Sequence, residues 1–173
     1  ARGRDGVRGR RLRRPRRPPR RAPRRRPAGG GPSPTAPVAA AVAAVLGFLL
    51  GSIPFALLIG LARGVDIRAV GSQNPGATNL GRTLGLRYFF LCFVLDAGKG
   101  FLPTFLYGSI AGVSGLARAV HLDPADAFLW LAVMCAPVLG HMFSPWIGLR
   151  GGKGVATGLG SLVGVFPVLS LPA

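Results

Sequence analysis

Two polar stretches of the sequence carry residues suited to holding phosphate groups. The first reads GSQNPGATNLGR from Gly71 to Arg82, and its hydroxyl and amide side chains can donate hydrogen bonds. Arg82, with Arg87 just beyond it, adds guanidinium forks that match the oxygens of a phosphate. Such a stretch alone is more often an ordinary turn. Between two apolar segments, however, polar backbone of this length indicates the lining of a cavity.

The second polar stretch runs from Gly140 to Thr157 and contains GGKG at residues 151–154, directly before an apolar segment. Successive backbone N–H groups at the start of a helix point toward an anion, and Lys153 adds a full positive charge. The stretch is not a Walker A loop, because Ile147 stands where the first Gly of that motif belongs. By themselves, GGKG would indicate a flexible turn and His141 a structural histidine.

A pair of opposite charges lies inside an apolar segment. Asp96 and Lys99 are three residues apart, so on a helix they share one face. Charged groups are costly in lipid and usually pair with each other, facing the protein interior. The pair is either a structural ion pair lining a site or a direct contact for the substrate, and the sequence favours neither.

Apolar segments flank both polar stretches and must position them. Residues 38–61 contain no charge and are long enough to cross a bilayer, although Pro54 should kink the helix. Residues 88–110 form a second span, interrupted by Asp96 and Lys99. Soluble helices are seldom apolar all round, so a membrane location is favoured over a buried core.

Two further apolar segments follow. Residues 127–139 are short for a full crossing, so this helix either extends back through Pro124 or enters beside a tilted neighbour. Residues 155–173 begin another apolar segment. We therefore predict an all-α fold, a polytopic transmembrane helix bundle with short polar loops.

The charges of the loops predict an orientation. The loop over residues 62–87 carries four Arg against Asp66, and the loop over residues 140–154 carries Arg and Lys without an acid. The loop over residues 111–126 carries Arg118 against two Asp. The positive-inside rule therefore places the first and third loops in the cytoplasm and the N-terminus outside.

Most of the charge of this 173-residue chain lies in its N-terminal tail. Residues 1–35 contain fourteen Arg and one acid, so they supply +13 of the net +17, whereas the mean hydropathy of the whole chain is +0.42. Adjacent Arg and frequent Pro cannot build a packed core, so we predict a disordered tail. An arm for nucleic acid or anionic lipid is one interpretation. We favour the interpretation that the tail is not native to the working protein, because so many positive charges conflict with an external N-terminus. We therefore expect no nucleic-acid partner.

Three motifs in order resemble the acyl-phosphate:glycerol-3-phosphate acyltransferase family, called PlsY. The first family motif resembles GSxNxGxTNxxRxxG and is matched from Gly71 to Gly85; the DxxKG motif is matched by Asp96, Lys99 and Gly100. A GH pair followed by GGKGVAT is matched by Gly140-His141 and residues 151–157. The resemblance covers about residues 45–160. The family's third motif, near its C-terminus, is not found, so we expect residues 36–173 to be a transmembrane acyltransferase domain truncated at its C-terminus.

The resemblance implies an enzyme that transfers a fatty acyl group from acyl phosphate to the 1-hydroxyl of glycerol 3-phosphate. The product would be 1-acylglycerol 3-phosphate, lysophosphatidate, in phospholipid biosynthesis. The resemblance also implies a multi-pass protein of the bacterial inner membrane whose active-site loops face the cytoplasm. Expected partners are the two substrates and membrane lipid, with an acyl-phosphate-producing enzyme as a further candidate. We expect no cofactor and no metal.

On the matched motifs, the resemblance implies three groups of site residues. The residues expected to be catalytic are Ser72, Arg82, His141 and Lys153. Those expected to bind substrate are Gly71, Asn74, Asn79, Gly151, Gly152, Gly154 and Thr157. Asp96 and Lys99 are expected to support the site. We expect residues 151–154 to grip the acyl phosphate, and the first polar stretch to orient glycerol 3-phosphate.

Two other function classes fit parts of the pattern. Polar, broken segments between spans also mark membrane transporters, here for a phosphorylated solute. The Arg-rich tail alone would suit a nucleic-acid-binding arm on a membrane anchor.

Overall fold

A computed structural model of the chain describes residues 35–111 and 122–170, with side chains up to residue 165. Nearly all of the predicted tail, and Arg118 of the predicted middle loop, lie outside the described residues. The chain divides into a unit of residues 1–30 and a unit of residues 31–173, and the following description concerns the second. The predicted boundary between residues 35 and 36 stays a prediction.

The described residues are all helical apart from their connections, which confirms the all-α prediction. The long helices, each with its bounds, are α1 (Ala36–Gly51), α4 (Leu86–Ile110), α6 (Pro124–Met142) and α7 (Val155–Ser170). The short elements are α2 (Phe55–Ala62), α3 (Ala77–Leu84) and the 3₁₀ helix η1 (Pro145–Ile147).

Three helical stretches in the described part of the chain are long and apolar enough to cross a membrane. They cover Ala36–Ala62, Leu86–Ile110 and Pro124–Ile147, and α7 adds a shorter apolar helix. Large apolar side chains such as Val42, Leu46 and Phe128 stay exposed, more than half of each. An exposed apolar surface on a long helix suits contact with lipid.

Two of the predicted segments differ in detail from the observed helices. The first span is broken rather than kinked: α1 ends at Gly51 and α2 begins at Phe55, because Pro54 has no N–H to continue the helix. The third predicted span, now α6, does extend back through Pro124. The carboxylate of Asp123 accepts a hydrogen bond of 2.9 Å from the Ala125 N–H and so caps this helix.

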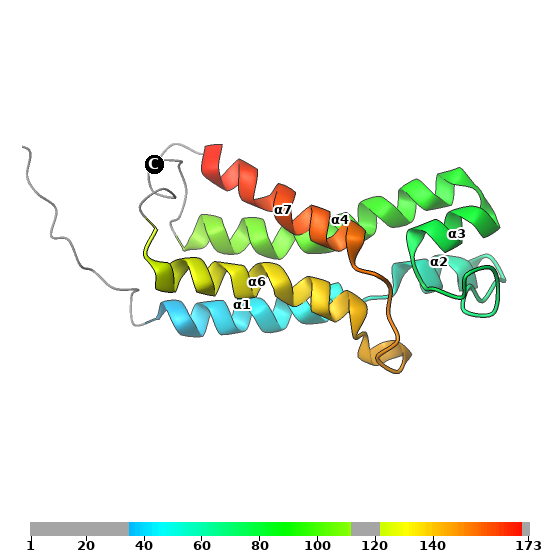
Figure 1. Ribbon diagram of the computed structural model, residues 1–173, viewed down its shortest axis with the longest axis horizontal. Helices are drawn as coiled ribbons and strands as arrows, with labels where there is room; N and C mark the ends of the chain where they lie inside the picture. Colours follow the sequence, from blue (N-terminus) through cyan, green and yellow to red (C-terminus); the bar gives the residue numbers. More distant parts are fainter. Residues whose placement is uncertain (1–34, 112–121, 171–173) are drawn as a thin grey trace, which may run out of the picture. The chain divides into compact units, whose positions relative to one another are not determined.

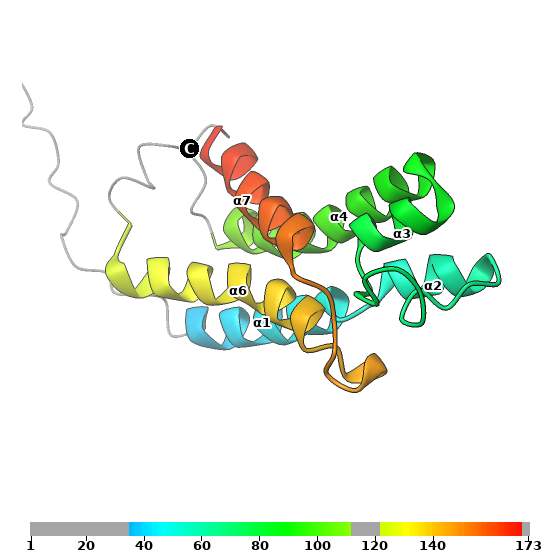
Figure 2. The same cartoon turned by 45° about the vertical axis from the view of Figure 1, so that its right-hand side comes forward.

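The long helices pack in two close pairs, α1 with α6 and α4 with α7 (Figures 1 and 2). Glycines permit this close approach. A Cβ added to Gly100 of α4 would overlap the Thr157 carbonyl oxygen of α7, and one added to Gly140 of α6 would overlap the Phe48 carbonyl oxygen of α1. Small residues at helix crossings are typical of membrane bundles, where van der Waals packing drives association.

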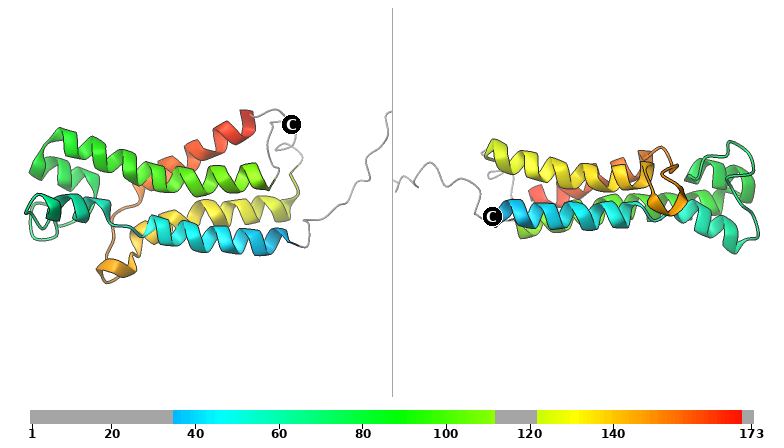
Figure 3. Two further views of the ribbon diagram at one scale, coloured as in Figure 1. Left: turned by 180° about the vertical axis from the view of Figure 1, so that it is seen from behind. Right: turned by 90° about the horizontal axis from the view of Figure 1, so that it is seen from below.

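The helices alternate in direction, so both polar stretches lie at one end of the bundle. Figure 1 shows α2, α3, η1 and the start of α7 together at this end, and the view from behind in Figure 3 agrees. An apolar cluster joins the elements here; its buried members are Ala56, Leu57, Ile67, Leu80, Tyr88 and Cys92. Ile147 of η1 packs against the same cluster, so the second polar stretch contacts the elements that carry the first.

Candidate active site

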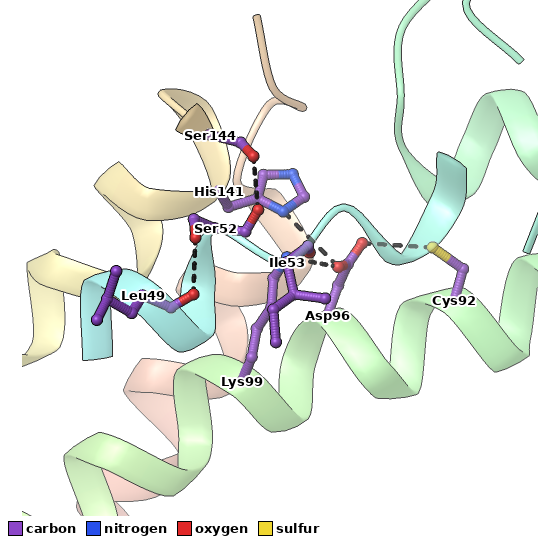
Figure 4. A network of polar contacts seen from close by, with 8 residues as sticks. All are labelled: Leu49, Ser52, Ile53, Cys92, Asp96, Lys99, His141 and Ser144. Atoms are coloured by element: carbon purple, nitrogen blue, oxygen red, sulfur yellow. Dashed lines mark hydrogen bonds and ion pairs between the residues drawn. The ribbon is translucent and has the colours of Figure 1, made fainter. Parts of the chain in front are cut away.

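The break in the first span offers two backbone carbonyls to other elements. The Ser52 carbonyl accepts a hydrogen bond of 2.6 Å from the Ser144 hydroxyl, and the Ile53 carbonyl accepts one of 2.9 Å from the Lys99 ammonium (Figure 4). Neither acceptor would be available in a continuous helix, where each carbonyl bonds to the N–H four residues on. The break therefore ties α4 and the second polar stretch to the first span.

A buried polar cluster lies beside this break. Lys99 Nζ is 2.8 Å from Asp96 Oδ1, and the two side chains are only 1% and 3% exposed. The Cys92 thiol donates to Asp96 Oδ2 at 3.4 Å, and His141 Nδ1 lies 3.7 Å from Asp96 Oδ1. Asp96 and Lys99 thus form an ion pair, which is one of the two alternatives that the sequence left open, and Figure 4 shows His141 turned toward it from α6. A buried pair of this kind needs such additional partners to offset the loss of hydration.

The GGKG segment lies directly over His141. The N–H of Gly151 donates to the Met142 carbonyl at 2.9 Å, and that of Gly152 donates to the His141 carbonyl at 3.1 Å. A Cβ on Gly151 would overlap the His141 carbonyl oxygen, and one on Gly152 would overlap the imidazole. Glycine is therefore required at Gly151, where the overlap is with backbone, whereas a side chain at Gly152 would displace the imidazole.

The same segment leads into the N-terminus of α7. Gly154 has a φ of +73°, a left-handed conformation that favours glycine, and α7 begins at the next residue. Lys153 is exposed, whereas Thr157 in the first turn of α7 is fully buried. The Thr157 hydroxyl has no hydrogen-bond partner among the described residues. The segment thus combines a helix N-terminus with an exposed cation.

A second set of contacts holds η1, which precedes the GGKG segment, to the break in the first span. The Trp146 indole N–H donates to the Ser52 hydroxyl at 2.8 Å, and this hydroxyl donates to the Leu49 carbonyl at 2.7 Å. Ser52, Ser144 and Trp146 were not predicted as site residues. Their partners lie 92 and 94 residues away in the sequence. In the sequence, the only sign of these contacts is the Ser-x-Pro pattern at the break.

The side chain of Asn79 shapes the first polar stretch. Its amide nitrogen donates to the carbonyls of Ile67, at 2.8 Å, and Val70, at 3.1 Å, while its oxygen accepts from the Ser72 N–H at 3.0 Å. Both donors of the amide are therefore used within the protein. Gly71 has a φ of +60°, and an added Cβ would overlap the Asn79 oxygen. These contacts fold residues 67–72 around Asn79.

The end of the first polar stretch is helical, which corrects the prediction of a loop throughout. Helix α3 begins at Ala77, directly after Gly76, and includes Arg82 in its last turn. Ser72 and Arg82 are exposed, and Asn74 is half-buried. Polar residues and Gly gave the stretch the composition of a loop, but Leu80 and Leu84 supply the apolar face that packs on the cluster.

The exposed cations differ in whether they are already paired. Arg82, Arg150 and Lys153 have no ion-pair partner within residues 35–111 and 122–165. Arg68, by contrast, binds both oxygens of Asp66 at 3.0 and 2.8 Å, and this hydrogen bonding lowers the pKa of Asp66 to about 2. Arg68 is therefore the cation in this region least available to a phosphate.

The family model described as glycerol-3-phosphate acyltransferase matches residues 41–173 of the chain. The chain belongs to this family. The predicted resemblance is thereby confirmed, and all the predicted site residues lie within the matched range.

Individual members of the glycerol-3-phosphate acyltransferase family support the assignment. A curated relative of that name from Hydrogenobaculum sp. (strain Y04AAS1) is 44% identical over 72% of this chain and 58% of its own length. Another from Leptospira borgpetersenii serovar Hardjo-bovis (strain JB197) is 43% identical over 71% of this chain and 52% of its own length. The chain thus spans a little over half the length of the curated relatives it matches.

The fold also matches a solved member of the glycerol-3-phosphate acyltransferase family. A crystal structure of PlsY, an integral membrane glycerol 3-phosphate acyltransferase in its glycerol 3-phosphate form, aligns with a TM-score of 0.63 and 40% identity. The alignment covers 74% of this chain and 58% of that chain. A lysophosphatidic acid form of PlsY aligns with a TM-score of 0.62. With three candidate spans, this likeness confirms a multi-pass transmembrane helix bundle.

Proposed function

We propose that the protein transfers a fatty acyl group from acyl phosphate to the 1-hydroxyl of glycerol 3-phosphate. The product is 1-acylglycerol 3-phosphate, which feeds phospholipid biosynthesis. The observation that carries the proposal is the GGKG segment, which rests on His141 at the N-terminus of α7 and exposes Lys153, while the His141 ring lies 3.7 Å from the buried Asp96–Lys99 pair. Relatives named for this activity, and a PlsY structure in its glycerol 3-phosphate form, support it.

The two polar stretches divide the substrates between them. Residues 151–154 bind the acyl phosphate, since Lys153 and the backbone N–H groups at the start of α7 stabilise the departing phosphate. Ser72, Asn74 and Arg82 orient glycerol 3-phosphate, so that positioning supplies much of the rate. Both polar stretches lie at the same end of the bundle, which suits a reaction between two phosphates.

In the proposed reaction, the acyl group passes directly from one substrate to the other without a covalent intermediate on the enzyme. The 1-hydroxyl oxygen of glycerol 3-phosphate attacks the acyl carbonyl carbon, and the bond from that carbon to the phosphate oxygen breaks. Inorganic phosphate leaves with the bonding electron pair, and a substrate phosphate accepts the hydroxyl proton. His141 serves to hold the GGKG segment, because its carbonyl and ring are both covered by that segment.

Several residues that were expected to bind substrate instead hold the segments of the site in position. Gly71 and Asn79 shape the first polar stretch, because the amide of Asn79 has no free donor. Thr157 lies buried behind the GGKG segment. Asp96 and Lys99 hold α4 to the break in the first span. Gly151 and Gly152 contribute backbone conformation, because their N–H groups bond to carbonyls at the end of α6. Gly154 contributes its left-handed backbone and its N–H group to phosphate binding at the start of α7.

The setting of the reaction is the bacterial inner membrane, with both polar stretches facing the cytoplasm. Arg63, Arg68, Arg82 and Arg87 outnumber Asp66 in one connection, and Arg150 and Lys153 lie in the other, in agreement with the positive-inside rule. Cytoplasmic loops would meet soluble glycerol 3-phosphate and an enzyme that produces acyl phosphate. The reaction as proposed requires no metal or cofactor, and no nucleic acid.

The decisive experiment supplies acyl phosphate and labelled glycerol 3-phosphate to proteoliposomes. The chain is tested by itself and extended by the C-terminal part of a longer relative. Labelled lysophosphatidate is expected, and Lys153→Ala or Arg82→Ala should abolish it while the protein stays folded. Arg68→Gln is the matched control, because its guanidinium is held by Asp66. Uptake of the phosphorylated solute without an acyl product would instead support a transporter.

A further inference from the structure

Two guanidinium groups lie over one aromatic ring at the start of α4. The Cζ atom of Arg87 is 4.8 Å from the centre of the Tyr88 ring, and that of Arg63 is 5.1 Å from it. Tyr88 is buried in the apolar cluster between α2, α3 and α4, whereas both arginines are exposed. A ring held rigidly by its neighbours thus fixes two cations from separate segments in one place.

These arginines lie at the level expected for lipid headgroups. The span Ala36–Ala62 ends directly before Arg63, and the span Leu86–Ile110 begins directly before Arg87. On the membrane side of each arginine, large apolar side chains stay exposed: Leu61 by 51% and Phe90 by 55%. A ligand here would meet positive charge at one end and an apolar surface at the other.

The described residues offer neither arginine a carboxylate. The nearest acid in this connection, Asp66, is bound at both oxygens by Arg68. The remaining ion pairs of the described residues involve Asp96, inside the bundle. Two like charges held at one ring repel each other, so an anion that contacts both guanidiniums would relieve this repulsion.

We propose that Arg63, Tyr88 and Arg87 form a binding site for the phosphodiester headgroup of an anionic phospholipid of the surrounding bilayer. The ring holds the guanidiniums in place, and their N–H groups donate to phosphate oxygens. Lipid rather than a soluble phosphate is the occupant, because the exposed apolar surface beside the arginines suits acyl chains. The site uses none of the residues assigned to the two substrates and does not depend on the proposed activity.

An interfacial arginine with a freely moving side chain would contact any anionic lipid weakly. The site proposed here makes a sharper prediction, a saturable and headgroup-selective affinity that needs both arginines and the ring between them. Arg68 provides the comparison, since it is exposed in the same connection but its charge is already neutralised.

The test measures the thermal unfolding midpoint of the purified chain in a neutral detergent. Dioctanoyl phosphatidylglycerol is titrated in, with dioctanoyl phosphatidylcholine as the neutral comparison. We expect a saturable rise in the midpoint with the anionic lipid only. In the Arg63→Gln/Arg87→Gln variant the apparent affinity should fall about 30-fold, since each such arginine contributes about 1 kcal/mol. Tyr88→Phe keeps the ring and should bind nearly as well as the unaltered chain.

Three outcomes would overturn the proposal. The first is a loss of binding in Arg68→Gln as large as in the double variant, which would reduce the effect to general surface charge. The second is stabilisation by phosphatidylcholine equal to that by phosphatidylglycerol, which would remove the role of headgroup charge. The third is displacement of the lipid by glycerol 3-phosphate or inorganic phosphate at millimolar concentration, which would make this the site of a soluble phosphate.

Discussion

Substitution of Gly151 by Ala tests how closely the GGKG segment must rest on α6. The new Cβ would overlap the His141 carbonyl oxygen, which is backbone at the end of a long helix and cannot rotate away. The segment must therefore retreat by on the order of 1 Å, and reacting groups displaced this far lose about 100-fold in rate. Retreat also weakens two hydrogen bonds, Gly151 to Met142 and Gly152 to His141, worth about 1 kcal/mol each.

We therefore expect kcat/KM for lysophosphatidate formation to fall about 100-fold, equivalent to about 2.7 kcal/mol. The assay follows labelled glycerol 3-phosphate with acyl phosphate as donor, in proteoliposomes of the chain extended as described above. Gly158→Ala is the control: it lies in α7 just beyond, where the nearest atom to a new Cβ is Val138 Cγ2 at 4.0 Å.

The position of the segment would be shown to matter if Gly151→Ala loses turnover with only a small fall in its unfolding midpoint, while Gly158→Ala keeps both. Activity within a factor of two of the unaltered chain in Gly151→Ala would refute the reasoning, because the segment would then tolerate displacement. Equal losses in both variants would point to disturbed helix packing instead.

Three further changes have expected outcomes. Ser144→Ala leaves the buried Ser52 carbonyl without its 2.6 Å partner, so the unfolding free energy in detergent should fall by about 1–2 kcal/mol. Gly100→Ala should separate α4 from α7 and lower the unfolding midpoint, whereas Gly98→Ala, with open space around it, should leave the midpoint unchanged or higher. The Asp66 pKa is about 2 against an ordinary 3.8, so the stability from its pair with Arg68 is full above about pH 4 and lost as pH falls toward 2. Unfolding midpoints of the unaltered chain and Asp66→Asn should therefore converge over that range; because the pair is half-exposed, the difference at neutral pH should be small.

The sequence was sufficient to predict the helical fold and the spans, because long apolar segments have few alternatives in a membrane. It also placed Asp96 and Lys99 on one face of an apolar helix, although it left open whether they form a structural pair or contact the substrate. Spans and the faces of single helices depend on residues that are close together in the sequence. The sequence left open whether residues 127–139 extend back through Pro124, and the structure shows that they do, with Asp123 as the capping residue and Pro124 in the first turn of α6.

The contacts of the first-span break could not be predicted in the same way. Pro54 was visible and suggested a kink, but a complete break is stable only because distant groups satisfy the freed carbonyls. Asn79 gives a second example, because its motif suggested a substrate contact and its donors are instead occupied by Ile67 and Val70. In both cases the outcome depends on tertiary partners, which the spacing of residue types does not reveal.

The break in the first span helps to build the proposed site for two phosphates at the edge of the membrane. Backbone carbonyls at Ser52 and Ile53 attract the donors of Ser144 and Lys99, and Lys99 in turn holds Asp96. Since these contacts satisfy the buried charges internally, the exposed cations Arg82 and Lys153 remain without carboxylate partners in the described part of the chain. A cation left unpaired in this way is available to a substrate phosphate, whereas one paired like Arg68 is not.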